Sequence, residues 1–131
     1  MLTQTAREPV PSTVQTLISS ELIRGTKVYN LEGDHLGTVI NVMIDKYTGQ
    51  VAYAVMSFGG FLGIGEKYHP LPWHVLKYDQ GIGGYMIDLD RDRLVSAPSY
   101  ALTDPLRWED NEWRTRLDEF YKRRDTTAKP S

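Results

Sequence analysis

The sequence has no cysteine among its 131 residues. This absence excludes disulfides, thiol catalysis and thiolate metal ligands, and it agrees with a reducing compartment. The chain also lacks an apolar run of about 18 residues, which a membrane-spanning helix requires. Its N-terminal residues have neither the basic start nor the apolar centre of a secretory signal. We therefore expect a cytoplasmic chain without a membrane span.

Neither sign of charge is in large excess. The chain has 15 Lys and Arg residues against 17 Asp and Glu residues, which gives a formal net charge of -2. A chain with this balance does not attract phosphate backbones as a whole, so nucleic-acid binding would need a local basic patch. We therefore expect no direct DNA binding. The hydrophobic share of 40% and the charged share of 24% are ordinary for one globular domain.

Three regions differ in composition. Residues 1–18 are rich in Thr, Ser, Gln and Pro, and they have too few large apolar side chains to offset the entropy cost of ordering them. This composition predicts a mobile N-terminal tail. Residues 19–97 form the predicted β domain. Residues 98–131 form a predicted C-terminal helical extension with a frayed end.

The β domain contains short segments with the sequence pattern of strands, and turn signals with Gly and Asp separate most of them. These segments are residues 27–29, 38–44, 51–58, 72–76 and 85–89. Short strands at this spacing, without amphipathic helices between them, favour a closed or nearly closed sheet with antiparallel neighbours. One helical turn, capped by Ser19 or Ser20 and ended by Gly25, is expected before the first strand.

Residues 110–121 have the pattern of an amphipathic helix, which Asp110 or Asn111 can cap. Its apolar side chains recur at helical spacing and are Trp113, Leu117, Phe120 and Tyr121. Acidic residues stand four positions before basic ones in three pairs: Glu112 with Arg116, Asp118 with Lys122, and Glu119 with Arg123. The apolar stripe must cover either the barrel or a neighbouring chain, and the sequence leaves this choice open.

Several motifs in the β domain occur together and in order. They are LIRGTKVYN at residues 22–30, GDHLG at 33–37, VMID at 42–45, TG at 48–49, GGFLGIG at 59–65 and LPW at 71–73. Over roughly residues 20–97 this combination resembles the PRC-barrel domain family. That family includes the cytoplasmic barrel of the photosynthetic reaction-centre H subunit, the C-terminal domain of the bacterial ribosome maturation factor, and small stand-alone bacterial proteins. This chain is similar to the stand-alone type.

The resemblance implies a mainly β fold, a small antiparallel β-barrel used as an adaptor or assembly module. The C-terminal amphipathic α-helix is added to this fold. No catalytic residues come with the resemblance. It does not carry over the transmembrane helix of the H subunit or the RNA-associated domain of the ribosome factor.

The glycine block superficially resembles a phosphate-binding loop. A P-loop needs Lys after its second glycine, where this chain has Glu66, and a dinucleotide fingerprint must lead into a helix. Here the next segment is extended and interrupted by Pro70 and Pro72. We therefore interpret the glycines as structural residues of a turn or bulge, namely Gly59, Gly60, Gly63 and Gly65. The large apolar residues among and beside them can fold back onto the barrel or form a contact patch: Phe58, Phe61, Leu62 and Ile64.

The polar residues do not form a recognisable catalytic or metal motif. The spacing of His35, His69 and His74 fits no common zinc site. The alternating carboxylates of residues 88–92 lack the glycine of a calcium loop, so we interpret them as a strand end with solvated acids. No nucleophile elbow occurs. We therefore expect no catalytic residue, metal or cofactor, and we assign Pro72 and Trp73 to core packing.

We hypothesise a non-enzymatic protein-interaction module that self-associates as a homodimer, through the glycine block or the C-terminal helix. The candidate contacts are Phe58, Phe61, Leu62, Ile64, Trp113, Leu117, Phe120 and Tyr121. One alternative is an adaptor that docks on a ribosomal or RNA-containing assembly, or on another protein complex. A less favoured alternative is a small-ligand or metal-binding enzyme with a pocket among Tyr53, His69 and His74.

Overall fold

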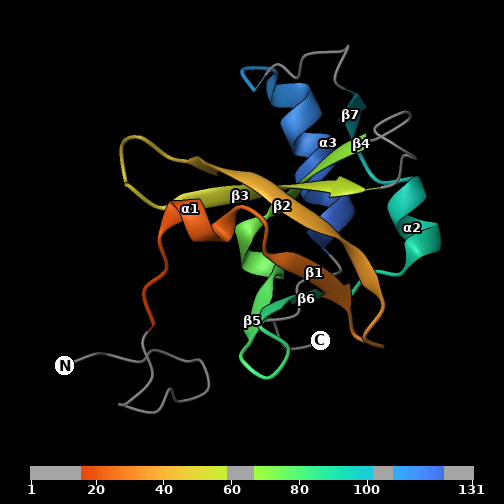
Figure 1. The fold of residues 1–131 in the computed structure, drawn as a ribbon. Coiled ribbons are helices and arrows are strands. Elements are labelled where there is room, and N and C mark those ends of the chain that lie inside the picture. The colour runs from red at the N-terminus through yellow and green to blue at the C-terminus, as the bar shows by residue number, and fades with distance from the viewer. Residues whose placement is uncertain (1–15, 59–66, 102–107, 123–131) are drawn as a thin grey trace.

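The computed structural model describes residues 16–58, 67–101 and 108–122. Within them, seven strands form one sheet (Figure 1) in the order β5-β6-β1-β2-β3-β4-β7. The strands are β1 (Lys27–Asn30), β2 (His35–Ile44), β3 (Val51–Phe58), β4 (Lys67–Pro72), β5 (Lys77–Asp79), β6 (Gly84–Ile87) and β7 (Tyr100–Ala101). The helices are α1 (Ser20–Ile23), α2 (Arg91–Val95) and α3 (Asn111–Tyr121), with a 3-10 turn η1 (Trp73–Val75).

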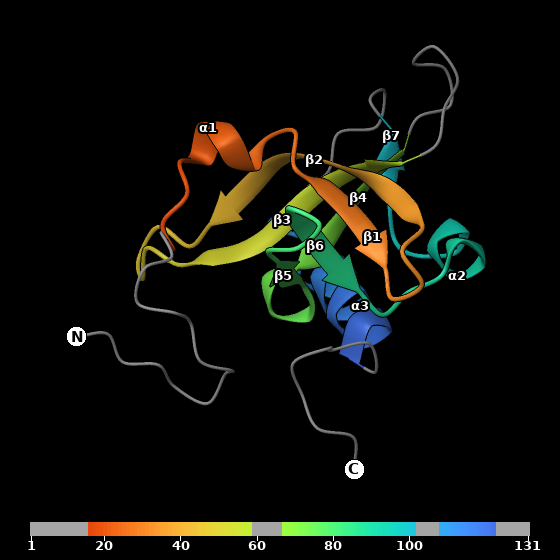
Figure 2. The same cartoon turned by 60° about the horizontal axis from the view of Figure 1, so that its bottom comes forward.

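Most neighbouring strands are antiparallel, which confirms the predicted mainly β, mainly antiparallel fold with a C-terminal helix. One pairing is parallel, because β6 returns beside β1 with Val28 opposite Tyr85. The sheet curls (Figure 2), and β5 and β7 are its two ends. Between the strands that the structure describes, no pairing joins those ends. The fold is therefore an incompletely closed barrel. Of the closed and the nearly closed sheet that the sequence allowed, the nearly closed one is observed.

The curl is produced locally in β2. Its register against β3 shifts between Val39 and Asn41 and again between Met43 and Ile44, and such bulges bend a strand and increase its twist. Gly37 permits the two strands to approach closely, because a Cβ at this position would collide with the carbonyl oxygen of Ser57. The second glycine of the GDHLG motif, Gly37, is thus required by the close packing of β2 and β3.

The predicted strand at residues 72–76 is wrong. Its segment is divided between the last residue of β4, the 3-10 turn η1 and the link to β5. The actual strand precedes it and contains Pro70 and Pro72, which pair with β3. Proline lacks the N–H that a central strand must donate, but β7 pairs only with Lys67 and Tyr68, so most of β4 is an edge strand.

The acids of residues 88–92 follow the end of a strand, and Asp88, Asp90 and Asp92 are exposed, as the sequence predicted. The strand β6 ends at Ile87, and α2 begins at Arg91. The side chain of Asp90 caps α2 by accepting the N–H of Arg93 at 2.8 Å. Asp90 thus has a structural role as a helix cap, which differs from the two predicted alternatives, calcium binding and solvation.

The core joins the sheet to all three helices. Its fully buried members include Val28, Val39, Met56, Leu71, Ile87, Leu94, Leu117 and Tyr121. Asn30 is a buried polar residue that organises the turn before β2, since its Oδ1 accepts the N–H groups of Glu32 at 3.0 Å and Asp34 at 2.8 Å. None of the helices in the described part of the chain is long and apolar enough to cross a membrane.

Candidate interaction surfaces

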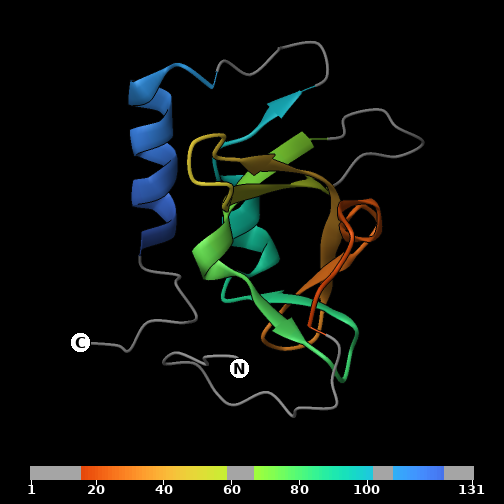
Figure 3. The same ribbon diagram turned by 90° about the vertical axis from the view of Figure 1, so that its left-hand side faces the viewer.

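The C-terminal helix α3 packs on its own chain. Leu117 and Tyr121 are fully buried in the core, and Trp113 and Phe120 are half-buried against it. The helix lies against β4 and stands along one side of the curled sheet (Figure 3). The apolar stripe therefore covers this chain's own sheet, which is one of the two alternatives that the sequence left open. A partner could reach Leu117 or Tyr121 only by displacing α3.

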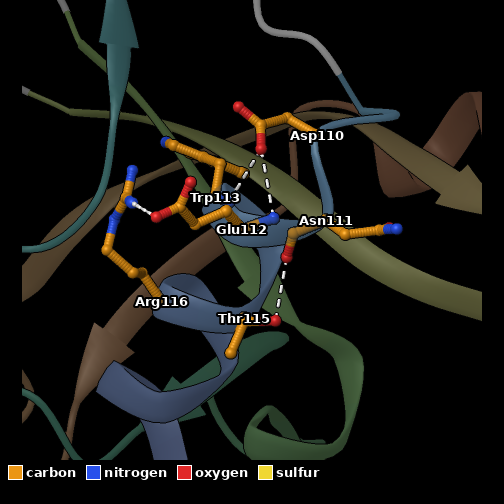
Figure 4. A network of polar contacts seen from close by, with 6 residues as sticks. All are labelled: Asp110, Asn111, Glu112, Trp113, Thr115 and Arg116. Carbon is orange, nitrogen blue, oxygen red and sulfur yellow. Dashed lines mark hydrogen bonds and ion pairs between the residues drawn. The ribbon is translucent and has the colours of Figure 1, made fainter.

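The start of α3 is fixed by side chains (Figure 4). The carboxylate of Asp110 accepts the N–H groups of Glu112 and Trp113, each at 3.1 Å. Glu112 also forms an ion pair with Arg116 at 3.8 Å, as the sequence predicted. Both charged side chains are well exposed, so this pair contributes little to stability.

Asp118 has a different role from the predicted one. Instead of pairing with Lys122, its carboxylate accepts the hydroxyl hydrogen of Tyr53 at 2.9 Å. Lys122 pairs with Glu119 at 3.9 Å. Burial of the Tyr53 hydroxyl raises its pKa, and the hydrogen bond to Asp118 raises that pKa further. Asp118 therefore ties α3 to β3.

An aromatic cluster surrounds this hydrogen bond. The ring of Tyr53 lies 5.3 Å from the ring of Trp108, which meets Trp113 edge-on at 6.1 Å. The guanidinium of Arg114 lies 5.8 Å from the centre of the Tyr53 ring, a distance within the range of cation–π attraction. Trp113 thus belongs to a half-buried cluster that holds α3 in place. The sequence gives no local sign of this cluster, because Tyr53 and Trp108 are far apart in the chain.

Phe58 covers a buried histidine. The side chain of His69 is 1% exposed, and the Phe58 ring meets it edge-on at 5.6 Å. Burial lowers the pKa of His69 to about 4, although a hydrogen bond to the backbone of Pro98 partly opposes this shift. Proline has only a carbonyl to offer, so His69 is the donor. Its Nδ1 has no partner among the described residues. His69 is therefore neutral at neutral pH.

The residues proposed for an enzyme pocket do not converge. Tyr53 pairs with Pro72, and His69 pairs with Met56. Positions 53 and 56 of β3 face opposite sides of the sheet, because successive side chains alternate. His74 lies beyond the strand, in η1, and is exposed. Within the described ranges, no group of three His, Asp or Glu side chains is placed to hold a metal ion.

Pro72 and Trp73 lie in packed surroundings. Pro72 is buried opposite Tyr53, and Trp73 is half-buried against the core. The indole of Trp73 meets the ring of Tyr85 edge-on at 5.3 Å, and Tyr85 meets Tyr78 at the same separation. These contacts join η1 to the β5–β6 hairpin.

The glycine block is not among the residues that the structure describes. The predictions for its glycines and apolar side chains therefore remain predictions: Gly59, Gly60, Phe61, Leu62, Gly63, Ile64 and Gly65.

Large apolar side chains are exposed at places that the sequence analysis did not select. On and just before α1, the exposed fractions are 81% for Leu17, 43% for Ile18 and 67% for Leu22. At the β2–β3 hairpin, they are 54% for Ile44 and 91% for Tyr47. The sequence signal for α1 was present but was interpreted only as a cap and one turn. A helix of one turn that buries Ile23 must leave Leu22 pointing elsewhere.

The hairpin that presents Tyr47 has a well-defined turn. The carboxylate of Asp45 accepts the N–H groups of Tyr47 at 2.8 Å and Thr48 at 3.1 Å. Gly49 has a φ of +77° and donates its N–H to the carbonyl of Asp45 at 2.8 Å. The hydrogen bonds from Thr48 and then Tyr47 lower the pKa of Asp45.

Comparison with known proteins identifies the domain. The family model of the PRC-barrel domain matches residues 16–94. Among solved structures, the chain is similar to a protein of Pseudomonas aeruginosa named as a 16S ribosomal RNA processing protein, RimM, with 20% identity and a TM-score of 0.37. The likeness covers 63% of this chain and 50% of that one, so it spans half of the other protein's length. A comparison with curated proteins found no match.

Proposed function

The chain belongs to the PRC-barrel domain family, and from this premise we propose that it is a non-enzymatic protein-interaction and assembly module that self-associates as a homodimer in the cytoplasm. The observation that carries the proposal is the apolar surface on and before α1, where Leu17 and Leu22 are 81% and 67% exposed. Burying one such side chain contributes about 1.5 to 3 kcal/mol. A cluster of this kind is typical of a surface that another chain covers.

The roles of the polar side chains support a non-catalytic function. Asp45, Asp90 and Asp110 accept backbone N–H groups of turns and helix ends. Asp118 is bonded to Tyr53, and His69 is buried and neutral. These groups stabilise the fold. The usual sign of a catalytic site is a cleft shared by acids or bases with perturbed pKa values, and these side chains do not share a cleft.

The contacts predicted from the glycine block remain part of this proposal. Phe61, Leu62 and Ile64 are candidate contacts. Phe58 precedes them in the sequence, at the end of β3, and is half-buried. On α3, Trp113 and Phe120 retain partial exposure and can border an interface.

Two differently tagged copies of the chain test self-association. When both are expressed together, capture through one tag should recover the other copy in comparable amount. A copy carrying only the second tag, expressed without the first, is the control for unspecific capture. Failure to recover the second copy in any salt condition would argue against the homodimer. Recovery of ribosomal proteins, lost at higher salt, would instead support the adaptor on a ribosomal assembly.

A further inference from the structure

His69 is a buried side chain with one ring nitrogen left unpaired. It is 1% exposed, lies opposite Met56 on β3, and meets the ring of Phe58 edge-on at 5.6 Å. Its ring N–H donates to the carbonyl of Pro98, in the segment that follows α2. The other ring nitrogen, Nδ1, has no partner among the described residues. A proton that neutral His69 takes up must therefore go to Nδ1, where it meets no acceptor in the described part of the chain.

Protonation places a charged, unpaired N–H group inside the core. Burying an ionised group without a partner is strongly unfavourable, and burial is the main reason why the pKa of His69 is lowered to about 4. The neighbouring groups among the described residues do not compensate this cost. Met56 and Phe58 on β3 carry no charge, and Lys67, two positions earlier on β4, opposes protonation by its own positive charge. Tyr100, on the segment after α2, stays neutral because burial raises its pKa. The charged side chains of α2 are exposed to solvent: Arg91, Asp92 and Arg93. A protonated His69 is therefore stabilised by reaching water.

The two neighbours of β4 hold it with very different strength. β3 pairs with β4 at six positions along its whole length, whereas β7 pairs with it at two, through Tyr100 and Ala101 (Figure 1). Within residues 96–101, which we call the closing segment, Ala97 is buried, but its side chain is small. The closing segment is thus the part of the cover over His69 that can open without unpairing β3 from β4.

We propose that the closing segment opens in response to acid: protonation of His69 releases residues 96–101 from β4, while β4 remains paired with β3. The opening breaks the hydrogen bond between His69 and Pro98, separates β7 from β4 and brings the imidazolium into contact with water. It also uncovers the end of β3 at Phe58. This inference does not depend on self-association, since every group that it uses belongs to one chain.

The size of the effect follows from the two proton affinities of His69. In the closed form its pKa is about 4, and in contact with water it returns to the ordinary value of 6.5. The open form therefore binds the proton more tightly, so that opening becomes more favourable as the pH falls from about 6.5 to about 4. By linkage, the opening constant rises about tenfold per pH unit in this window and about thirtyfold between pH 8 and pH 5.

Amide hydrogen exchange of the full chain at pH 8 and pH 5 tests this opening. Each measured rate is compared with the intrinsic rate of the same amide at the same pH, which gives a protection factor. The protection factors of the β4–β7 amides should fall about thirtyfold between the two pH values. At both pH values they should also be at least about tenfold smaller than those of the β2–β3 amides, because β2 and β3 separate only when the sheet unfolds.

Two histidine variants assign the effect to one side chain. His69→Gln keeps an N–H donor for the carbonyl of Pro98 and does not titrate, so the protection of the β4–β7 amides should change less than about twofold between pH 8 and pH 5. His35→Gln is the matched control, because His35 is exposed on β2 and contacts Arg91 of α2 through its backbone carbonyl. It should keep the change of about thirtyfold. Circular dichroism checks that both variants are folded.

The proposal is supported by β4–β7 amides that are less protected than the β2–β3 amides and lose protection in acid, with the loss abolished in His69→Gln and kept in His35→Gln. It is overturned if the β4–β7 and β2–β3 amides have the same protection at both pH values, because His69 would then be protonated only on unfolding. Equal protection of the β4–β7 amides at pH 8 and pH 5, or an acid-induced loss that persists in His69→Gln, overturns it as well. The wild-type measurements need no variant, so the test holds even where His69→Gln fails to fold.

Discussion

The helices α1 and α3 begin in the same way and end in different surroundings. Ser19 caps α1 and Asp110 caps α3, each by accepting a backbone N–H two residues later. α3 has 11 residues and buries two side chains completely, whereas α1 has four residues and buries only Ile23. A cap shows where a helix begins, but the length of the apolar stripe decides whether the helix can be covered by its own chain.

The physical reason is the number of turns. α3 has about three turns, so an apolar residue recurs on one face and that face can lie along a strand. α1 is far shorter than the length at which an isolated helix becomes stable. It is held by the backbone bond between Gly25 and Val39 and by Ile23, and the rest of its surface stays open.

The largest expected effect distinguishes the two helices directly. Leu117→Ala should lower the free energy of unfolding by about 2 to 5 kcal/mol, because it leaves a cavity in the core. Leu22→Ala should change it by less than about 0.5 kcal/mol, because the side chain is mostly exposed. Urea unfolding at low protein concentration measures both. An equal loss in the two variants would contradict the contrast between the helices.

His69 lies on β4, the strand that α3 covers. Because His69 titrates, the contrast between covered and exposed regions also predicts how stability depends on pH. Its pKa in the folded chain is about 4, against 6.5 as its ordinary value. The unfolded chain therefore binds the proton first, and stability should be full above pH 6.5 and fall as the pH drops to about 4. The expected loss is about 3 kcal/mol.

The control is His69→Gln, which keeps an N–H donor for Pro98 and does not titrate. Unfolding free energies of the variant and the wild type, measured across this pH range, should differ in slope. Parallel curves would show that His69 is not the group responsible.

The smallest expected effect concerns the hydrogen bond that ties α3 to β3. Tyr53→Phe keeps the ring against Trp108 and removes only the donor to Asp118, so it should cost about 1 kcal/mol. Glu112→Gln is the matched control, because it weakens an exposed ion pair, and it should cost less than about 0.5 kcal/mol. Thermal unfolding of the two variants compares them. If both shift the midpoint equally, Asp118 contributes no more than a surface charge.

Much of the fold could be predicted from local pattern. The turn of α1 with Gly25, the strands around residues 38–44 and 51–58, and the capped helix α3 all follow from periodicity and capping residues. The strand predicted at 72–76 was wrong because the residues before it, Lys67–Pro72, pair with β3, and most of β4 is an edge strand that tolerates Pro70 and Pro72. The parallel pairing of β1 with β6 is a tertiary contact that local pattern does not encode.

The candidate surface was less predictable for the same reason. The apolar stripe of α3 could be recognised in the sequence, but the residues that pack beside it could not. Tyr53 is far from α3 in the sequence, and Trp108 precedes the helix and is not part of its apolar repeat. Asp118 has the spacing of a surface ion pair, and only the fold shows that it faces Tyr53. The exposure of Leu22 depends on which side of a single turn Ile23 occupies, which the sequence leaves undetermined.

The mass of the unmodified chain in solution tests the central claim most directly. Sedimentation equilibrium over a wide concentration range should show a reversible shift from the chain mass of 15.0 kDa at high dilution to twice that mass on concentration. A single species of 15.0 kDa at every concentration would contradict the claim that the exposed apolar face of this domain is covered by a second copy.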